Sequence, residues 1–262
     1  MAVQVTQFRQ VTDPSGTLVV IEAGLDVPFR FCSVDIHDAD GIELMMDFDP
    51  GVPFLLIPVC GELNVISESG TLIVSTPNDV VVSDGCFAVK VSSNDPAARF
   101  IVLSSRQQTM SNNLAHEARV GEFLASARSV GSDRGGTKDE WATTCPFEIK
   151  RIYFTHSVNP NMKRGGHAHW ALNQMLIAAW GQVSLTLEKN DEVVDVLLDS
   201  PGSGVLITPV TWRDITFGPS AVLLVLASEP YNESDYIRDR ASFEAVLQVG
   251  GSNTTFGGFD AV

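Results

Sequence analysis

The sequence predicts an all-β protein built from two similar barrels. Short runs of β-branched and apolar residues recur along the 262 residues, and Gly, Pro, Asn and Asp separate these runs. Charged residues make up 19% of the chain and hydrophobic residues 44%, a balance that indicates a packed globular protein and not a disordered one. In addition, the two halves resemble each other at a nearly constant offset. Together these observations predict two tandem barrels.

Individual strands are predicted where an apolar run lies between two turn signals. These runs are Thr17–Ile21, Phe54–Val59, Gly70–Val74, Gly181–Leu187, Gly204–Ile207 and Ala221–Ala227. Helical spacing of apolar residues occurs in two other segments, Leu114–Val130 and Ser234–Val249. We therefore expect one barrel at 1–105, a partly helical linker at 106–140, and a second barrel with a C-terminal helix at 141–262.

Two pairs of matching segments reveal the repeat. Pro28–Phe31 parallels Pro146–Ile149 at an offset of 118 (146 minus 28), and Cys60–Val65 parallels Trp180–Leu185 at an offset of 120 (180 minus 60). A repeat of this length indicates that both halves have the same scaffold.

His167 and His169 are the most informative residues of the second half. Alternate residues of a strand face the same side, so the two imidazoles are expected to project together. They lie in the segment Arg164–His169, and Gln174 and then Gly181 follow at the end of an apolar run. This layout resembles the first cupin motif, which implies that the two units are cupin (jelly-roll) barrels.

The first half lacks this histidine pair. Carried back by 120 residues, the positions of His167 and His169 are occupied by Asp47 and Asp49. We expect these acids to be a hydrogen-bonded or solvated remnant, and the first barrel to be catalytically degenerate.

The composition excludes several classes of partner. A net charge of −15 argues against nucleic acid and anionic membranes as partners. No apolar run reaches the roughly 18 residues that a membrane span needs, and the N-terminus lacks a signal-peptide pattern. The four cysteines, Cys32, Cys60, Cys86 and Cys145, are scattered without a CxxC pair and predict reduced thiols in a cytoplasmic protein.

From about Pro146 to Leu247 the chain resembles the sugar 3,4-ketoisomerases of nucleotide-linked deoxysugar biosynthesis. The matching stretches are Pro146–Tyr153, Arg164–His169, Thr208–Arg213, Leu226–Ser228 and Tyr231–Arg238. The resemblance implies an isomerase, an intramolecular oxidoreductase that moves the ketone of a TDP-4-keto-6-deoxyhexose from C4 to C3.

The segment Thr12–Glu22 resembles the N-terminal hairpin of the same family. Family members resemble dimers that exchange N-terminal strands, so we expect the fused barrels to imitate such a dimer and residues 1–22 to approach the second barrel. Before the second barrel, around Ser132–Thr137, we find no good copy of this hairpin. Whether the fused chain forms a further homodimer stays open.

The chemistry requires a base at C3, stabilisation of an enediolate, and an acid at C4. Histidine suits proton transfer because its ordinary pKa lies near neutral pH. We expect His169 to act as the base and His167 to complete the transfer, although the reverse order stays open. Arg213 is expected to stabilise the enolate charge, and the resemblance implies that an arginine here accompanies a 3-keto-6-deoxy-glucose product. Tyr153 is expected to complete the catalytic group.

Further residues are predicted to bind substrate. Arg151 shares a strand face with Tyr153 and could bind the pyrophosphate, and Arg164 could clamp a phosphate in bidentate fashion. Trp212 is expected to pack on thymine or the sugar, and Gln174 is a further predicted contact. His37 and His156 are expected in loops or at the surface.

A metal site is the competing interpretation of the histidine pair. Metallo-cupins add a carboxylate about five residues on and a third histidine on a later strand, whereas this chain has Gln174 and Arg213. Because a guanidinium cannot ligate a cation, we expect no metal and no other cofactor. Three alternatives remain open: a non-catalytic nucleotide-sugar-binding cupin, a cupin-type epimerase with a tyrosine acid, and a metallo-oxygenase.

Overall fold

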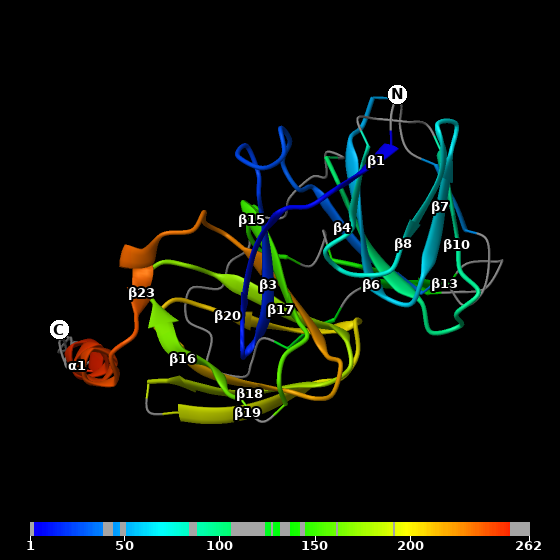
Figure 1. The fold of residues 1–262 in the computed structure, drawn as a ribbon. Coiled ribbons are helices and arrows are strands. Elements are labelled where there is room, and N and C mark those ends of the chain that lie inside the picture. The colour runs from blue at the N-terminus through cyan, green and yellow to red at the C-terminus, as the bar shows by residue number, and fades with distance from the viewer. Residues whose placement is uncertain are drawn as a thin grey trace, which may run out of the picture.

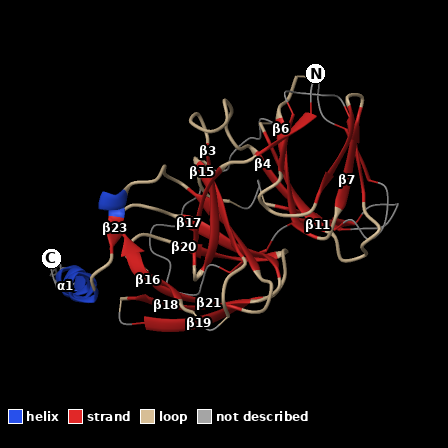
Figure 2. Cartoon of the chain, viewed as in Figure 1, coloured by secondary structure: helices blue, strands red, loops and turns tan. Residues whose placement is uncertain are grey.

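In the computed structural model of the chain, strands dominate the described residues and confirm the all-β prediction (Figures 1 and 2). The structure describes residues 3–38, 44–47, 51–83, 88–105, 124–126, 128–131, 137–141, 145–160, 162–190 and 192–251. Within this part of the chain, none of the helices is long and apolar enough to cross a membrane.

The first barrel consists of two sheets. Its large sheet runs in the spatial order β1 (Val3–Thr6), β9 (Val80–Ser83), β6 (Phe54–Cys60), β11 (Arg99–Ser104), β4 (Ser33–Asp38), β14 (Thr137–Glu140), β13 (Arg128–Gly131). Its small sheet runs in the order β5 (Leu44–Asp47), β10 (Ala88–Ser92), β7 (Leu63–Ser67), β8 (Gly70–Val74).

The second barrel repeats this arrangement. Its large sheet is ordered β12 (Leu124–Ser126), β20 (Ser203–Ile207), β17 (Gln174–Trp180), β22 (Val222–Ala227), β15 (Arg151–His156), β3 (Gly16–Glu22), β2 (Arg9–Asp13). Its other sheet is ordered β19 (Glu192–Leu198), β18 (Val183–Lys189), β21 (Trp212–Phe217), β16 (Arg164–His169), β23 (Tyr236–Ile237). Apart from β23, each strand has its counterpart in the first barrel, so the predicted repeat is confirmed.

The two barrels exchange hairpins. In the sequence, each hairpin comes just before the strands of one barrel, but in the structure it pairs with strands of the other barrel. The hairpin β2–β3 is placed in the second barrel, where β3 pairs antiparallel with β15 from Thr17↔His156 to Glu22↔Arg151. In return, β13–β14 is placed in the first barrel, where β14 pairs with β4. The expectation that residues 1–22 approach the second barrel is confirmed. The expectation that the N-terminal hairpin has no good copy before the second barrel is wrong, because β13–β14 is that copy.

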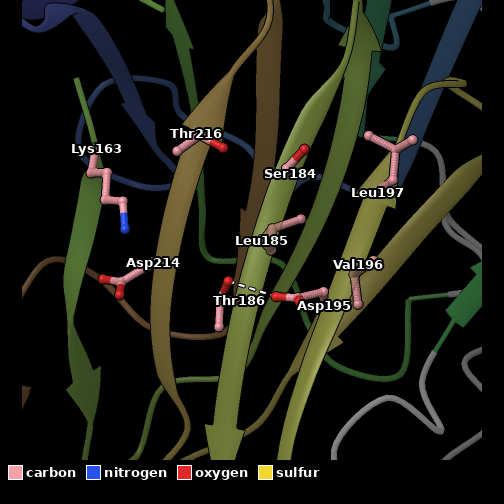
Figure 3. Close-up of a pocket in the computed structure, with 9 residues that line it drawn as sticks. All are labelled: Lys163, Ser184, Leu185, Thr186, Asp195, Val196, Leu197, Asp214 and Thr216. Atoms are coloured by element: carbon pink, nitrogen blue, oxygen red, sulfur yellow. Dashed lines mark hydrogen bonds between the residues drawn. The ribbon is translucent and has the colours of Figure 1, made fainter. Parts of the chain in front are cut away.

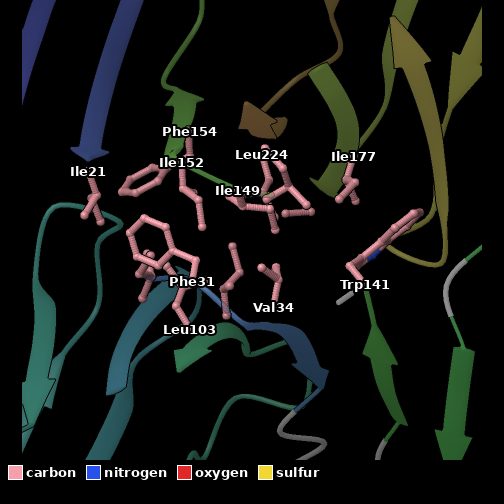
Figure 4. Packing of buried hydrophobic residues seen from close by; sticks show 14 of the residues in the cluster. Ile21, Phe31, Val34, Leu103, Trp141, Ile149, Ile152, Phe154, Ile177 and Leu224 are labelled. Atoms are coloured by element: carbon pink, nitrogen blue, oxygen red, sulfur yellow. The ribbon is translucent and has the colours of Figure 1, made fainter. Parts of the chain in front are cut away.

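A single hydrophobic core joins the two barrels. Figure 4 shows Phe31, Val34 and Leu103 of the first barrel facing Ile21, Ile152, Phe154 and Leu224 of the second barrel's sheet. Two smaller clusters fill the barrel interiors, one around Leu63 and Val91 and the other around Leu185 and Ile207. Because burial of apolar surface is the main favourable term in folding, the barrels stabilise each other through the shared core.

The hairpin glycines Gly61 and Gly181 explain the match between Cys60–Val65 and Trp180–Leu185. Gly61 has a φ of +74°, and a Cβ there would lie 2.8 Å from the Cβ of Ala98. Gly181 has a φ of +68°, and a Cβ there would lie 2.9 Å from the Cα of Ala221. Both turns therefore need a residue without a side chain.

The two predicted helices are corrected by the structure. Within Leu114–Val130, the described residues form β12 and the start of β13, and residues 106–123 lie outside the described residues. The helix predicted over Ser234–Val249 begins later, as α1 (Arg240–Gly251), because the preceding residues form the 3-10 helix η1 (Glu233–Asp235) and β23. Pairing of β23 with β16 outweighs the local helical spacing.

His37 and His156 also differ from expectation, since they lie on β4 and β15. His156 is buried, and its Nε2 lies 3.1 Å from Oδ1 of Asn78 in the first barrel. This histidine therefore belongs to the contact between the barrels.

Candidate active site

His167 and His169 project together from β16, as their spacing predicts. Their ring centroids lie 5.0 Å apart with the planes at 90°. A β-bulge between Gly165 and His167 shifts the register against β21. Gly165 has a φ of +91°, and any Cβ there would clash with the carbonyl of Arg213. The glycine thus permits the close approach of β16 to β21 that sets the direction of the histidines.

The two imidazoles have different hydrogen-bond partners. Nδ1 of His167 lies 2.9 Å from the carbonyl oxygen of Gly165, and Nδ1 of His169 lies 3.0 Å from Oδ2 of Asp235. Both partners are acceptors only, so Nδ1 carries the proton in each ring. The Nε2 atom of each ring is then the available base.

Burial, followed by the charge of Arg213, lowers the pKa of His167 to about 4 and that of His169 to about 2. Both rings are therefore neutral near pH 7. A neutral imidazole can accept a proton, so this state fits a general base. The Nε2 atom of His169 is buried and has no hydrogen-bond partner among the described residues.

Arg213 lies opposite His167 in the β16–β21 register. Its side chain is 1% exposed, and none of its three guanidinium nitrogens has a hydrogen-bond partner among the described residues. Burial lowers the pKa of Arg213 to about 10, which still leaves it charged near pH 7. A buried cation without a partner is costly, so this position is suited to bind a negatively charged oxygen.

Tyr153 and Gln174 come from the large sheet, on β15 and β17. Nε2 of Gln174 donates a hydrogen bond of 2.5 Å to the phenolic oxygen of Tyr153. Burial raises the pKa of Tyr153 to about 12, so the phenol keeps its proton. With its oxygen already accepting from Gln174, the hydroxyl has a proton to donate into the site.

The two arginines predicted to bind phosphate lie at different places. The guanidinium of Arg151 lies over the rings of Tyr153 and Tyr231, at 5.4 and 5.7 Å from their centroids. Arg164 donates a hydrogen bond of 2.9 Å from Nη1 to Oγ of Ser15, in the turn of the β2–β3 hairpin. The exchanged hairpin therefore reaches the strand that carries the histidines.

Trp212 lies on the other face of β21. Its side chain packs with Ala168, Ile237 and Phe243, and its ring centroid is 5.3 Å from that of Phe243. Because neighbouring residues of a strand face opposite sides, Trp212 and Arg213 cannot both point into the barrel. The structure therefore does not bring Trp212 together with the other predicted site residues.

Asp235 and Tyr236 were not singled out by sequence reasoning. Tyr236 packs on both imidazoles, with centroid distances of 4.2 Å to His169 and 5.0 Å to His167. Both residues lie within the stretch Tyr231–Arg238, whose family resemblance was the available signal. Of the remnant acids in the first half, Asp47 ends β5 and Asp49 lies outside the described residues.

In the described ranges, no three His, Cys, Asp or Glu side chains come together as a candidate metal site. A groove of about 380 Å³ lies elsewhere, on β18, β19 and β21 (Figure 3). Its lining includes Thr186 on β18 and its cross-strand neighbour Asp195 on β19, and the Thr186 hydroxyl donates a hydrogen bond of 2.7 Å to Oδ1 of Asp195. None of the predicted site residues lines this groove, so it is separate from the histidine site.

Comparisons with known proteins find relatives of this chain. A family model described as "FdtA: WxcM-like, C-terminal" matches residues 127–248. The TDP-4-oxo-6-deoxy-alpha-D-glucose-3,4-oxoisomerase of Aneurinibacillus thermoaerophilus is 36% identical over 103 residues, which are 39% of this chain and 74% of the relative.

Two solved structures are also similar. One is QdtA, a sugar 3,4-ketoisomerase from Thermoanaerobacterium thermosaccharolyticum in complex with TDP, with 32% identity, a TM-score of 0.44, and coverage of 48% of this chain and 94% of that chain. The other is WlaRA, a TDP-fucose-3,4-ketoisomerase from Campylobacter jejuni, with 25% identity, a TM-score of 0.45, and coverage of 47% and 93%.

Proposed function

The chain belongs to the FdtA family of TDP-sugar 3,4-ketoisomerases, and on this premise we propose that His167, His169, Tyr153 and Arg213 of its second barrel carry the reaction. The protein is an isomerase of deoxysugar biosynthesis. Its substrate is a TDP-4-keto-6-deoxyhexose, whose ketone moves from C4 to C3.

The proton transfers follow from the states of the two histidines. Nε2 of His169 removes the proton from C3, and the C3–H electron pair forms a C3=C4 double bond while O4 gains negative charge. The proton of the O3 hydroxyl leaves as C3 becomes the ketone, and C4 receives a proton. His167 completes this transfer between the sugar oxygens and C4. The numbers of protons and electrons are unchanged, as an isomerisation requires.

The buried guanidinium of Arg213, which has no hydrogen-bond partner in the described part of the chain, is the observation that carries this proposal. A buried positive charge that is in place before the reaction can stabilise the negative oxygen of an enediolate. The phenol of Tyr153 can donate a second hydrogen bond. Both groups are fixed by strands before the substrate arrives, so little reorganisation accompanies the reaction.

In this proposal Arg151 and Arg164 bind the diphosphate of the TDP group. Arg151 is 4% exposed, and its Nε has no hydrogen-bond partner among the described residues. A guanidinium can bind phosphate oxygens in bidentate fashion. Gln174 orients Tyr153 and lines the same site, and Trp212 is left out of the proposed substrate contacts.

We also propose that the fused barrels act as an internal strand-exchanged dimer with one working site per chain. The reciprocal placement of β2–β3 and β13–β14 supports this arrangement. In this proposal the barrels comprise residues 1–105 and 141–262 except for the exchanged hairpins, and the first barrel is non-catalytic. Titration calorimetry with TDP should then give one binding site per chain, whereas two equal sites would contradict the proposal.

Proton NMR of TDP-4-keto-6-deoxyglucose in D₂O tests the reaction directly. The chelator-treated protein should form a 3-keto product with deuterium at C4 and a 3-keto-6-deoxy-glucose configuration. His169→Asn should abolish the conversion, whereas His37→Asn, on β4 of the first barrel, should leave it unchanged.

The other functions make different predictions for the same spectra. Tight TDP binding with an unchanged spectrum would favour a non-catalytic binding protein. Deuterium at C5 alone would favour an epimerase. Activity lost on chelation and restored by a transition metal would contradict the metal-independent mechanism.

A further inference from the structure

We propose that Asp235 is the positioning residue that keeps the proton of His169 on Nδ1 and thereby leaves Nε2 free to act as the base. This inference rests on the proposed function for the reaction it serves. The tautomer itself is a property of the free protein and can be measured without substrate.

Asp235 reaches His169 from a distant part of the sequence. Its Oδ2 lies 3.0 Å from Nδ1 of His169, and 66 residues separate the two. The imidazole is 1% exposed and the carboxylate 16% exposed, so water competes little for this hydrogen bond. The contact exists because β23, directly after Asp235, pairs with the end of β16 at His169↔Tyr236.

The carboxylate is fixed from both sides. Oδ1 of Asp235 accepts a hydrogen bond of 2.8 Å from the backbone N–H of Ala171. The backbone carbonyl of Asp235 accepts another, at 2.9 Å, from the N–H of Trp170. Each carboxylate oxygen therefore has its own donor, and only a carboxylate can accept from both.

The surroundings of His169 explain why this acid matters. Arg213, Arg151 and Arg238 all act on the imidazole as positive charges and oppose its protonation. When Nε2 takes a proton from the sugar, an imidazolium forms beside these cations. Asp235 is the carboxylate in hydrogen-bond contact with that ring, so it stabilises the charge as it develops. The ring of Tyr236, at 4.2 Å, holds the imidazole against rotation.

Asp235→Asn separates positioning from packing because the two side chains have nearly the same shape. An amide has one oxygen and one NH₂ group. If the oxygen accepts from Ala171, the NH₂ group faces Nδ1 of His169, which must then lose its proton and transfer it to Nε2. The base is thereby blocked. An acid-to-amide change that imposes the wrong histidine tautomer costs about 10⁴-fold in kcat in a serine protease.

The experiment combines kinetics with ¹⁵N NMR of histidine-labelled protein. The chain has five histidines, and His169→Asn identifies the signal of His169. In the wild type we expect Nδ1 protonated and Nε2 bare, and in Asp235→Asn the reverse. We expect kcat to fall by about 10²–10⁴-fold while KM changes little, because both carboxylate oxygens of Asp235 are already hydrogen-bonded within the protein. Asp195→Asn makes the same acid-to-amide change at an aspartate that accepts a side-chain hydrogen bond from Thr186 and is not one of the proposed site residues, and it serves as the matched control.

Each outcome bears on one proposal. Full kcat in Asp235→Asn, or a wild-type His169 with its proton on Nε2, would overturn the role of Asp235. The tautomer of His169 is measured in the wild type, so the proposal can still be tested if Asp235→Asn folds poorly. If the wild type does not convert the sugar, the proposed reaction fails, and the tautomers alone then decide whether Asp235 positions His169.

Discussion

Phe31 and Ile149, which occupy the same position in the two repeats, pair with each other in an antiparallel β-bridge. Beside them, Nη1 of Arg30 lies 2.8 Å from Oε1 of Glu148, which is also an equivalent pair. Contact between equivalent residues is the mark of a two-fold axis in a symmetric dimer. The bridge therefore marks a pseudo-two-fold axis that relates the two fused barrels.

We expect Phe31 and Ile149 to be energetically coupled through the core that joins the barrels. Phe31→Ala should lower the free energy of unfolding by about 3–5 kcal/mol and Ile149→Ala by about 2–5 kcal/mol. The double variant should lose less than the sum by roughly 0.5 kcal/mol or more, because the two cavities adjoin. Urea unfolding measures these values. Ile149→Ala combined with Val65→Ala, which lies in a separate cluster, should be additive. Additivity of the first pair would contradict the shared core.

The adjacent glycines Gly165 and Gly166 should respond differently to alanine. Both have positive φ values, of +91° and +63°. A Cβ at Gly166 would meet no atom within 4 Å, so Gly166→Ala should cost only about 1–2 kcal/mol of backbone strain. Gly165→Ala should cost more and should also lower kcat, since the clash with the Arg213 carbonyl displaces β16. Thermal unfolding and turnover would show this order, and equal effects of the two substitutions would be evidence against the bulge as the device that directs the histidines.

Arg213→Met should separate stability from activity. The buried guanidinium has no partner among the described residues, so its removal should raise the free energy of unfolding by on the order of 1 kcal/mol. Loss of the charge that stabilises the enediolate should lower kcat by about 10²–10³-fold. Arg99→Met is the opposite case, because Arg99 contacts Asp38 and the carbonyl of Ala179, and it should destabilise the protein. A destabilised Arg213→Met would indicate a structural role instead.

Acid should destabilise the protein through its buried histidines. The folded state holds the pKa of His167 at about 4 and that of His169 at about 2, below the ordinary value of 6.5. Below about pH 6.5 the unfolded chain therefore binds more protons than the folded chain, and stability falls as the pH falls. Each histidine contributes up to about 1.4 kcal/mol per pH unit. His156, whose pKa burial also lowers, acts in the same direction.

Urea unfolding of the wild type and of His169→Asn at several values between about pH 7 and pH 5 measures this effect. The variant should lose less stability over that interval, because it has one fewer group to protonate. Parallel curves for the two proteins would show that His169 is not held neutral in the fold. Activity should not decline between pH 8 and about pH 6, in contrast to an enzyme with an ordinary histidine base.

The sequence by itself determined what depends on short-range periodicity. The alternation of a strand places His167 and His169 on one face wherever β16 lies, and it places Trp212 and Arg213 on opposite faces. The sequence did not determine whether Trp212 or Arg213 points into the barrel interior. The repeat was visible in the sequence because turns such as those at Gly61 and Gly181 accept few residue types, so both halves have the same residue there.

Only the tertiary structure decided what depends on pairing between distant segments. The local pattern of Leu114–Val130 suggested a helix, but among its described residues pairing with other strands formed β12 and part of β13. The hairpin β13–β14 became recognisable as the partner of β2–β3 only through its pairing with β4. Asp235 meets His169 because β23 closes against β16 across 66 residues, and no spacing in the sequence encodes that contact. Hydrogen bonds and burial between remote segments thus outweigh local propensity, and in this protein they set the surroundings of the proposed base.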